Sequence, residues 1–397
     1  MTMETERLLK DTSLTKGLIF LLAISGGVSV ANIYYNQALL ATISKSFHET
    51  SQSIGLLPTF TQLGYALGLF FFVPLGDIKE KKKLIVSLLI LVAISLLGLA
   101  SAQSLVWIYI ASLAVGLTSV VPQIIIPFAA ELTIPEERGK VVGTIVSGLL
   151  VGILLARTVA GYVGELVGWR YMFVFASFLM CLLACILYFK LPNIKPTVNL
   201  TYKEVLRSII TISKKYSTLK EASIIAALMF GAFGVFWTTL TFLLEGSPYY
   251  MNSGQAGLFG LIGIIGALGA PLIGRLSDKS SPKLLVITCI IIGIFSYVCF
   301  YFLGMSIIGL VLGVILLDLG VQGAQVSNQT RIQALNPNEG SRLNTIYMVC
   351  NFGGGAIGSL LGSSAWSLFG WRGVCILGIG MTLMSLYTCL RFNKSYK

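Results

Sequence analysis

Long apolar segments constrain this chain more than any other feature. A transmembrane α-helix needs about 20 consecutive apolar residues, because each residue adds about 1.5 Å and the hydrocarbon core is about 30 Å thick. Twelve segments of this length occur, so we predict an all-α integral membrane protein with twelve transmembrane helices. They lie near residues 17–42, 53–75, 84–102, 106–131, 140–166, 171–190, 222–245, 256–276, 284–304, 307–333, 342–368 and 372–391.

The composition agrees with a membrane protein and argues against other classes. Of the 397 residues, 55% are hydrophobic and 11% are charged, whereas a soluble domain has about 25% charged residues. The seven cysteines all lie in apolar segments, without the spacing of a metal site or a disulfide framework. The sequence contains no phosphate-binding Gly-x4-Gly-Lys-Ser/Thr stretch and no nucleophile–base pair. We therefore predict a protein that is not an enzyme and that uses no cofactor, metal or ATP.

The basic residues indicate how the chain crosses the membrane. The 28 Lys and Arg residues outnumber the 16 acidic residues and give a net charge of +12. When both termini are placed in the cytoplasm, only Lys45, Arg170 and Arg372 fall in external loops. This distribution follows the positive-inside rule, so the positive charge indicates topology and not nucleic-acid binding. We predict a multi-pass protein of the plasma or inner membrane, with cytoplasmic termini and membrane lipid around it.

Short motifs recur along the chain at one offset. Gly-Trp-Arg occurs at 168–170 and again at 370–372, and Pro-Glu-Glu at 135–137 matches Pro-Asn-Glu at 337–339. Such an internal duplication predicts two like-oriented six-helix bundles related by a pseudo-twofold axis along the membrane normal. The expected parts are an N-terminal bundle at 1–191, a cytoplasmic linker at 192–221 and a C-terminal bundle at 222–397.

The loops after the second and eighth predicted helices carry related motifs. They read VPLGDIKEKKKL (73–84) and GRLSDKSSPK (274–283). Because of these two loop motifs and the internal duplication, the chain resembles the major facilitator superfamily over its whole length. The resemblance implies a cytoplasmic gate, in which an acid pairs with cations or with a helix N-terminus and holds one side shut. The implied gate residues are Asp77, Lys81, Lys82, Gly274, Asp278 and Lys279.

The predicted fifth helix is similar to the antiporter signature of the proton-coupled, drug- and metabolite-exporting branch of that superfamily. Its glycine spacing from Gly143 to Gly161 matches the signature, but Ala156 and Arg157 stand where the signature has Gly-Pro. The fourth helix has Ser112 where exporters of this branch carry an arginine. We expect Arg157 to replace that arginine functionally.

Polar residues form stripes on the four helices that line the central cavity in the major facilitator fold. Residues spaced i, i+4 and i+7 share one helical face, and polar side chains in lipid are costly unless they face water or protein. The expected substrate cavity residues are Asn32, Tyr35, Asn36, Gln123, Trp237, Thr238, Thr241, Gln322 and Gln325. The alternative is that these side chains only hydrogen-bond to neighbouring helices.

Two charged residues, Arg157 and Asp318, are predicted near the middle of transmembrane helices. A charge at this depth costs about 2.5–3.5 kcal/mol on insertion scales. Because the two lie at similar predicted depths, we expect them to form a charge pair. In this hypothesis Asp318 takes up a proton and releases Arg157. The alternatives are a structural ion pair without proton exchange and an anionic substrate held by Arg157.

These observations favour a proton-coupled secondary transporter that exports a small organic compound, a drug or a metabolite, by alternating access. One alternative is a proton symporter that imports a small polar or anionic solute. An alternative from another class is a membrane sensor that binds a compound without transporting it. The expected partners are a small-molecule substrate, protons and lipid, and the resemblance implies a monomer.

Overall fold

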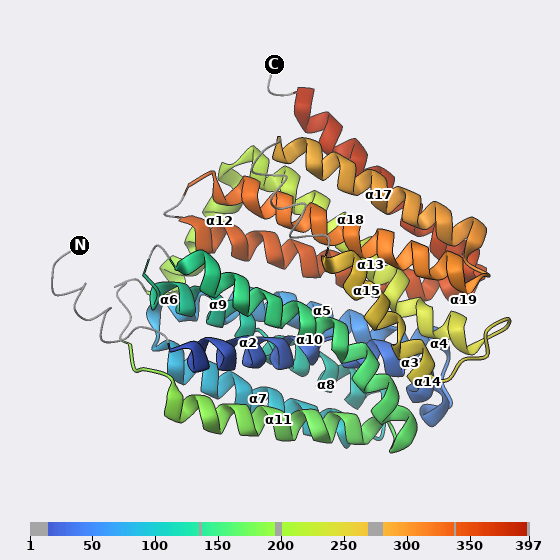
Figure 1. Ribbon diagram of the computed structural model, residues 1–397, viewed down its shortest axis with the longest axis horizontal. Helices are drawn as coiled ribbons and strands as arrows, with labels where there is room; N and C mark the ends of the chain where they lie inside the picture. The colour runs from blue at the N-terminus through green and yellow to red at the C-terminus, as the bar shows by residue number, and fades with distance from the viewer. Residues whose placement is uncertain (1–14, 135–136, 195–200, 269–280, 337–338, 395–397) are drawn as a thin grey trace.

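The computed structural model describes residues 15–134, 137–194, 201–268, 281–336 and 339–394, and all regular secondary structure in these ranges is helical (Figure 1). In the first half, the helices are α2 (Lys16–Ala31), α3 (Tyr35–Phe47), α4 (Ser51–Ile54), α5 (Leu56–Phe71), α6 (Leu75–Ile78), α7 (Lys81–Ala100), α8 (Leu105–Thr118), α9 (Val121–Glu131), α10 (Arg138–Leu166) and α11 (Trp169–Lys190). In the second half, they are α12 (Tyr202–Lys215), α13 (Ser217–Glu245), α14 (Ser253–Gly257), α15 (Phe259–Leu268), α17 (Pro282–Leu303), α18 (Ile307–Gln333) and α19 (Gly340–Lys394).

The predicted membrane-spanning helices other than the one at 256–276 are present in the described ranges. In the described ranges, ten helical segments are long and apolar enough to cross a membrane. The segment Gly340–Phe392 contains the two last predicted helices, which are separated at Gly370 by a non-helical backbone conformation (φ 60°, ψ −153°). The predicted helix at 256–276 corresponds to α14 and α15, and its remainder lies outside the described residues.

Two of the predicted helices are interrupted near their middle. At residues 32–34, between α2 and α3, the amides of Ile33 and Tyr34 bond to carbonyl oxygens only three residues back. A similar turn separates α8 from α9, where Pro122 lacks an amide donor. Interrupted helices at membrane depth are tolerated where they are buried in protein or line a cavity. The break between α2 and α3 is therefore expected to be buried in protein or to line a cavity.

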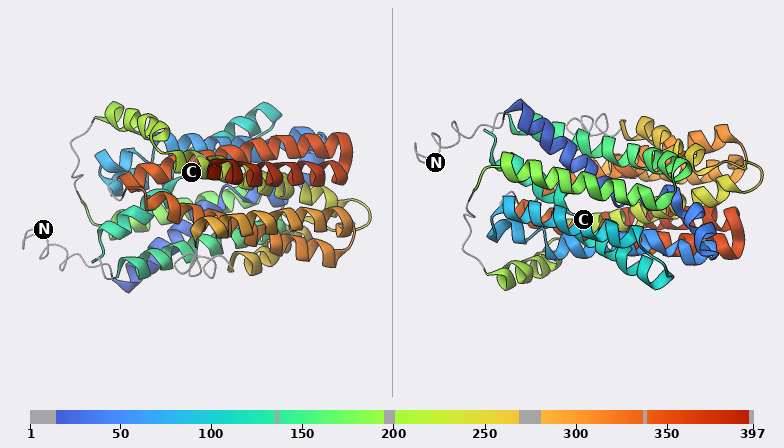
Figure 2. Two further views of the ribbon diagram at one scale, coloured as in Figure 1. Left: turned by 90° about the horizontal axis from the view of Figure 1, so that it is seen from above. Right: turned by 90° about the horizontal axis from the view of Figure 1, so that it is seen from below.

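The two halves repeat the same packing. In the first half, α2 packs on α10 and α7 packs on α11. In the second half, α13 and α17 pack on α19 in the corresponding way, α17 on its end. Figure 1 shows the first half below and the second half above, and Figure 2 shows the same bundles from two further sides. The halves meet along two seams, where α5 contacts α19 and where α10 contacts α14 and α15. Any residue near these seams belongs to the interface between the bundles.

The repeated Gly-Trp-Arg motif has one structural role in both halves. Gly168 and Gly370 both have a positive φ, 98° and 60°, which favours glycine because it has no Cβ. The tryptophan that follows is buried in each case: Trp169 packs against Phe173, and the Trp371 indole donates a hydrogen bond to the Phe300 carbonyl oxygen. The duplication seen in the sequence is thus a duplication of a helix-to-helix turn.

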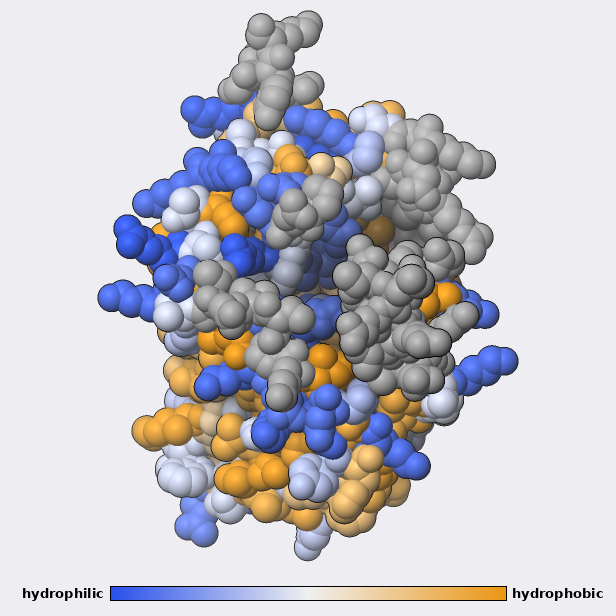
Figure 3. All heavy atoms as spheres, turned by 90° about the vertical axis from the view of Figure 1, so that its left-hand side faces the viewer, coloured by the Kyte–Doolittle hydropathy of each residue, from blue (hydrophilic) through white to orange (hydrophobic). Residues whose placement is uncertain are grey.

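One end of the molecule, which we call the basic end, carries the start of α7 and helix α12. Figure 3 shows many hydrophilic side chains on this end. The described part of the linker contains the amphipathic helix α12, in which Val205, Ile209 and Ile212 are buried on the protein side, while Ile210 is 51% exposed. Tyr202 fixes α12 to the first half through a hydrogen bond to the Phe71 carbonyl oxygen.

Candidate functional site

Arg157 lies at the seam between the two bundles and is only 2% exposed. Its helix, α10, approaches α2 closely, because Gly27 and Gly152 face each other without side chains. A methyl group at Gly152 would lie 2.5 Å from the Gly27 Cα atom, so this crossing requires glycine. The close crossing brings the following turn of α10, with Arg157, beside the break between α2 and α3.

The guanidinium of Arg157 is held in one orientation by groups from both halves. Its Nε donates a hydrogen bond of 2.9 Å to Oε1 of Gln37, on α3. Its central carbon lies 3.8 Å from the ring centre of Trp237, on α13, and 4.9 Å from that of Tyr34. A cation stacked on an aromatic ring is stabilised by about 2 kcal/mol or more when both are desolvated. These contacts compensate part of the cost of burying the charge.

The outer nitrogens of Arg157, Nη1 and Nη2, are buried and have no hydrogen-bond partner among the described residues. Two more donors nearby, Nε2 of Gln37 and Nε1 of Trp237, are also without a partner there. Buried donors are nearly always satisfied in proteins, so each exception calls for an explanation. The site therefore presents a group of unused donors around one positive charge.

Asp318, on α18, is 1% exposed, and neither carboxylate oxygen has a hydrogen-bond partner in the described part of the chain. The ion pairs found among those residues do not include Asp318 or Arg157. The two charges interact electrostatically without direct contact. Their assignment as a proton-coupling pair stays a prediction.

A row of glycines positions both charges, and the sequence analysis did not identify it. Gly257 and Gly260 lie against Arg157: a methyl group at Gly260 would be 3.0 Å from its Cβ. Gly263 and Gly266 lie against Asp318: a methyl group at Gly263 would be 3.2 Å from Oδ2. The spacing of three residues in GLFGLIGIIG was a visible signal, because it places glycines along one side of a helix. We call these four residues the glycine row.

The predicted cavity residues of the helices predicted at 17–42 and 222–245 are buried and largely used in contacts between helices. The Asn36 amide donates to Thr61 Oγ1 (2.9 Å), and the Thr238 hydroxyl is hydrogen-bonded to the Ser359 hydroxyl (2.9 Å). Asn32 contacts the Met180 sulfur, and Tyr35 is 4% exposed. Thr241 is buried with a hydroxyl that has no partner in the described ranges. Trp237 alone among them stacks on Arg157.

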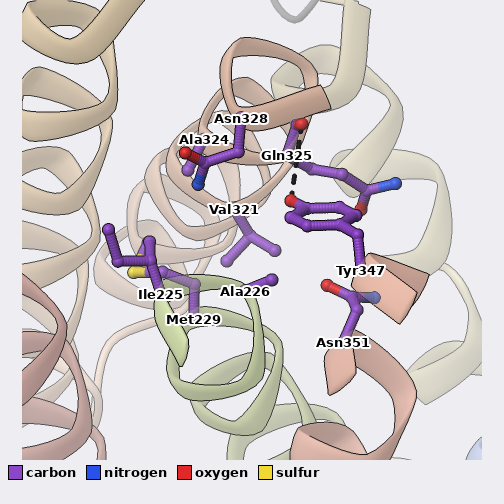
Figure 4. A pocket seen from close by; sticks show the side chains of 9 residues that line it. All are labelled: Ile225, Ala226, Met229, Val321, Ala324, Gln325, Asn328, Tyr347 and Asn351. Carbon is purple, nitrogen blue, oxygen red and sulfur yellow. Dashed lines mark hydrogen bonds between the residues drawn. The ribbon is translucent and has the colours of Figure 1, made fainter. Parts of the chain in front are cut away.

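The predicted glutamines lie apart from this cluster. Gln123 and Gln322 are half-buried. Gln325 lines a small pocket between α13, α18 and α19, together with Asn328 and Asn351 (Figure 4). In that pocket the Tyr347 hydroxyl points to the Gln325 carbonyl oxygen at 3.5 Å. Of the predicted cavity residues, Trp237 therefore contacts Arg157, and Gln325 lines a separate pocket.

The predicted gate is described only in the first half. Lys81 forms an ion pair with Glu131, and the Lys82 ammonium lies 5.3 Å from the ring centre of Tyr188. Asp77 is half-buried, and its charge interacts with those of Lys81 and Arg342, a base from the other bundle. The three remaining gate residues, Gly274, Asp278 and Lys279, lie outside the described residues.

Two helical bundles that meet at a buried, charged seam form the architecture of a membrane transporter that works by alternating access. Comparison with known proteins supports this class. The chain matches the model of the Major Facilitator Superfamily over residues 22–339, and it belongs to that family. It is a transporter of this type and not an enzyme.

Two relatives and one solved structure illustrate the similarity. The chain is 44% identical to the putative uncharacterized transporter YgaY of Escherichia coli K12 over 94% of this chain and 95% of the relative. It is 32% identical to the probable transporter SCO4007 of Streptomyces coelicolor, over 94% and 86%. The crystal structure of a mutant of the nucleoside transporter NupG superposes with a TM-score of 0.76 at 14% identity, over 94% of this chain and 99% of that chain.

Proposed function

We propose that this chain is a proton-coupled secondary transporter that moves a small organic compound by alternating access. The carrying observation is Asp318, a carboxylate that is 1% exposed and has no hydrogen-bond partner among the described residues. The Asp318 side chain has two possible protonation states. The ionised form is attracted electrostatically by Arg157, and the neutral form has taken up a proton. A group with two such states at the seam between moving bundles suits proton coupling.

The proposed direction is export, by exchange of the compound for protons. It rests on the similarity of the Gly143–Gly161 segment to an antiporter signature. The positive-inside rule supports the proposal that the basic end and both termini lie in the cytoplasm, and the proposed location is the plasma or inner membrane. We propose a monomer in lipid.

A second candidate function is proton symport of an anionic solute into the cell. The specific observation that favours it is the pair of unpartnered nitrogens, Nη1 and Nη2, on Arg157 within the described structure. A buried guanidinium with free donors attracts a negatively charged group.

Proton flux in liposomes tests the proposed function. The purified full chain is reconstituted, a pH-sensitive dye is enclosed, and candidate compounds of neutral, cationic and anionic charge are added on one side. We expect at least one compound to drive proton movement, and Asp318→Asn to abolish that movement. Glu204→Gln, in the linker helix, is the control acid. Normal coupling in Asp318→Asn contradicts the assignment, and binding of a compound without any flux supports a sensor instead.

A further inference from the structure

We propose that Arg157 is the recognition residue for the substrate, and that the substrate is an organic anion whose carboxylate binds Nη1 and Nη2. This inference rests on the proposed transport function and names its substrate class. The guanidinium has a planar fork of donors that matches the two oxygens of a carboxylate. In this structure the Nε side of the fork is bound to Gln37, while the Nη1–Nη2 edge is buried and unpartnered within the described residues.

Local charge also favours an anion. The partners of Arg157 in the described part of the chain are a neutral amide and the rings of Trp237, Tyr34 and Phe233, and none of these carries a negative charge. A buried charge without a counter-charge costs several kcal/mol. Asp318 contributes only a through-space attraction. A bound carboxylate supplies both the missing charge and the missing acceptors.

Two residues that contact Arg157 also have unused hydrogen-bond donors. Nε2 of Gln37 and Nε1 of Trp237 are donors, and both lack a partner among the described residues. An anion with two or more acceptor oxygens satisfies several donors at once, whereas a cation satisfies none. Because Gln37 belongs to the first bundle and Trp237 to the second, a ligand at this position contacts both moving parts.

The rings around the guanidinium suggest the shape of the substrate. Tyr34, Phe233 and Trp237 surround Arg157 at 4.9, 5.6 and 3.8 Å between the guanidinium carbon and each ring centre. Flat apolar groups pack well against such rings, in stacked or edge-to-face arrangements. An aromatic carboxylate therefore fits this site better than a small inorganic anion.

Proton binding and anion binding support each other in this arrangement. Ionised Asp318 and a bound carboxylate are both negative and are both attracted to Arg157, so they compete. Protonation of Asp318 removes this competition and leaves Arg157 available to the substrate. The titratable groups that interact with Asp318 are Arg157 and Tyr34, while α15 presents glycines to it. By linkage, the proton increases the affinity for the anion and the anion increases the affinity for the proton. This relation favours the symport candidate.

Ligand binding to the purified full chain tests the inference. The probes are benzoate, naphthoate, phenylacetate and hexanoate, each compared with its neutral amide, and binding is followed by tryptophan fluorescence and by the melting temperature. We expect carboxylates to bind at least tenfold more tightly than amides, and more tightly at pH 5.5 than at pH 8. Arg157→Gln should reduce carboxylate affinity at least tenfold, and Arg157→Lys should reduce it less.

Arg170→Gln is the matched control, because Arg170 also stacks on a tryptophan, Trp169 (4.2 Å), but lies at the end of the bundle. Asp318→Asn should bind carboxylates without pH dependence. Equal binding of amides and carboxylates, undiminished binding in Arg157→Gln, or no carboxylate binding at millimolar concentration overturns the inference. If proton-coupled flux of a neutral or cationic compound survives Arg157→Gln, the inference fails while the transport function stands. If carboxylates bind as expected but no compound drives flux, the inference about Arg157 stands while the proposed transport function fails.

Discussion

At the scale of single residues, Arg157 is stabilised mainly by neutral neighbours. It has one hydrogen bond to Gln37 and a stacking contact with Trp237, and it keeps two unpartnered nitrogens in the described structure. A leucine at this buried position would carry no charge to desolvate, so stability alone does not explain an arginine here. The contacts fix the orientation of the guanidinium but place no negative group in direct contact with it, which is an arrangement suited to a ligand.

Gln37→Glu should stabilise the fold and block transport. The new carboxylate would accept the Nε hydrogen bond and neutralise Arg157, and hydrogen bonds to charged groups contribute about 1.5–3 kcal/mol. We expect a higher melting temperature, together with at least a tenfold loss of substrate affinity. Gln37→Leu is the control, because it removes the hydrogen bond without adding charge and should lower the melting temperature. Unchanged transport in Gln37→Glu argues against Arg157 as the binding group.

The stacking of Arg157 on Trp237 should be measurable as a coupling energy. A double-mutant cycle combines Trp237→Phe with Arg157→Gln, and unfolding is followed in mixed micelles. Coupling between contacting residues is about 0.5–3 kcal/mol, and a phenyl ring holds a cation less strongly than an indole. We expect Trp237→Phe to be less destabilising in the Arg157→Gln background. Additive effects of the two substitutions contradict a direct stacking contact.

At the scale of elements, α15 and its glycine row determine where the two deep charges lie. The spacing of apolar residues predicted the helices, and the depths of Arg157 and Asp318 followed from their positions in them. The sequence did not reveal the partners of Arg157, because Gln37 and Trp237 reach it only through the break after Ala31 and the packing of distant helices. Tertiary contacts of this kind have no local sequence signal.

Gly260→Ala should be destabilising, whereas Gly143→Ala should not. A methyl group at Gly260 would lie 2.8 Å from the Leu154 carbonyl oxygen and 3.0 Å from Arg157 Cβ, while one at Gly143 meets nothing within 4 Å. Overpacking costs about 1–3 kcal/mol, and alanine is favoured over glycine inside a helix by up to about 1 kcal/mol. Thermal unfolding of both variants measures the difference. Equal melting temperatures would mean that α10 and α15 are not in close contact.

At the scale of the whole molecule, polar side chains join the two bundles at the end opposite the basic end. There Lys45 pairs with Glu245, and Glu165 accepts hydrogen bonds from the Asn252 side chain and the Gly254 amide. At the basic end, pairs such as Lys81 with Glu131 and Arg331 with Glu221 stay within one bundle. The described residues therefore show direct polar contacts between the bundles at the opposite end, which we call the closure.

A charge swap should test the contribution of Lys45 and Glu245 to this closure. Lys45→Glu alone places two negative charges together, and the double variant Lys45→Glu with Glu245→Lys restores the attraction. Because the Lys45 side chain is 76% exposed, and exposed pairs contribute about 0.2–1 kcal/mol, we expect a shift of up to about fivefold toward opening. Spin labels at the exposed His48 and Tyr250 report the distance between bundles. If Lys45→Glu leaves the distance distribution unchanged, the Lys45–Glu245 ion pair does not contribute to the closure.

The glycine row also bears on how fast the bundles can move. Arg157 and Asp318 both pack against glycines of α15, and no hydrogen bond joins either charge to that helix in the described structure. The row is nevertheless tied to α10, because the Thr158 hydroxyl donates a hydrogen bond of 2.9 Å to the Gly257 carbonyl oxygen. We therefore expect any movement of the row along α10 to break this hydrogen bond, so that its strength contributes to the barrier between conformations.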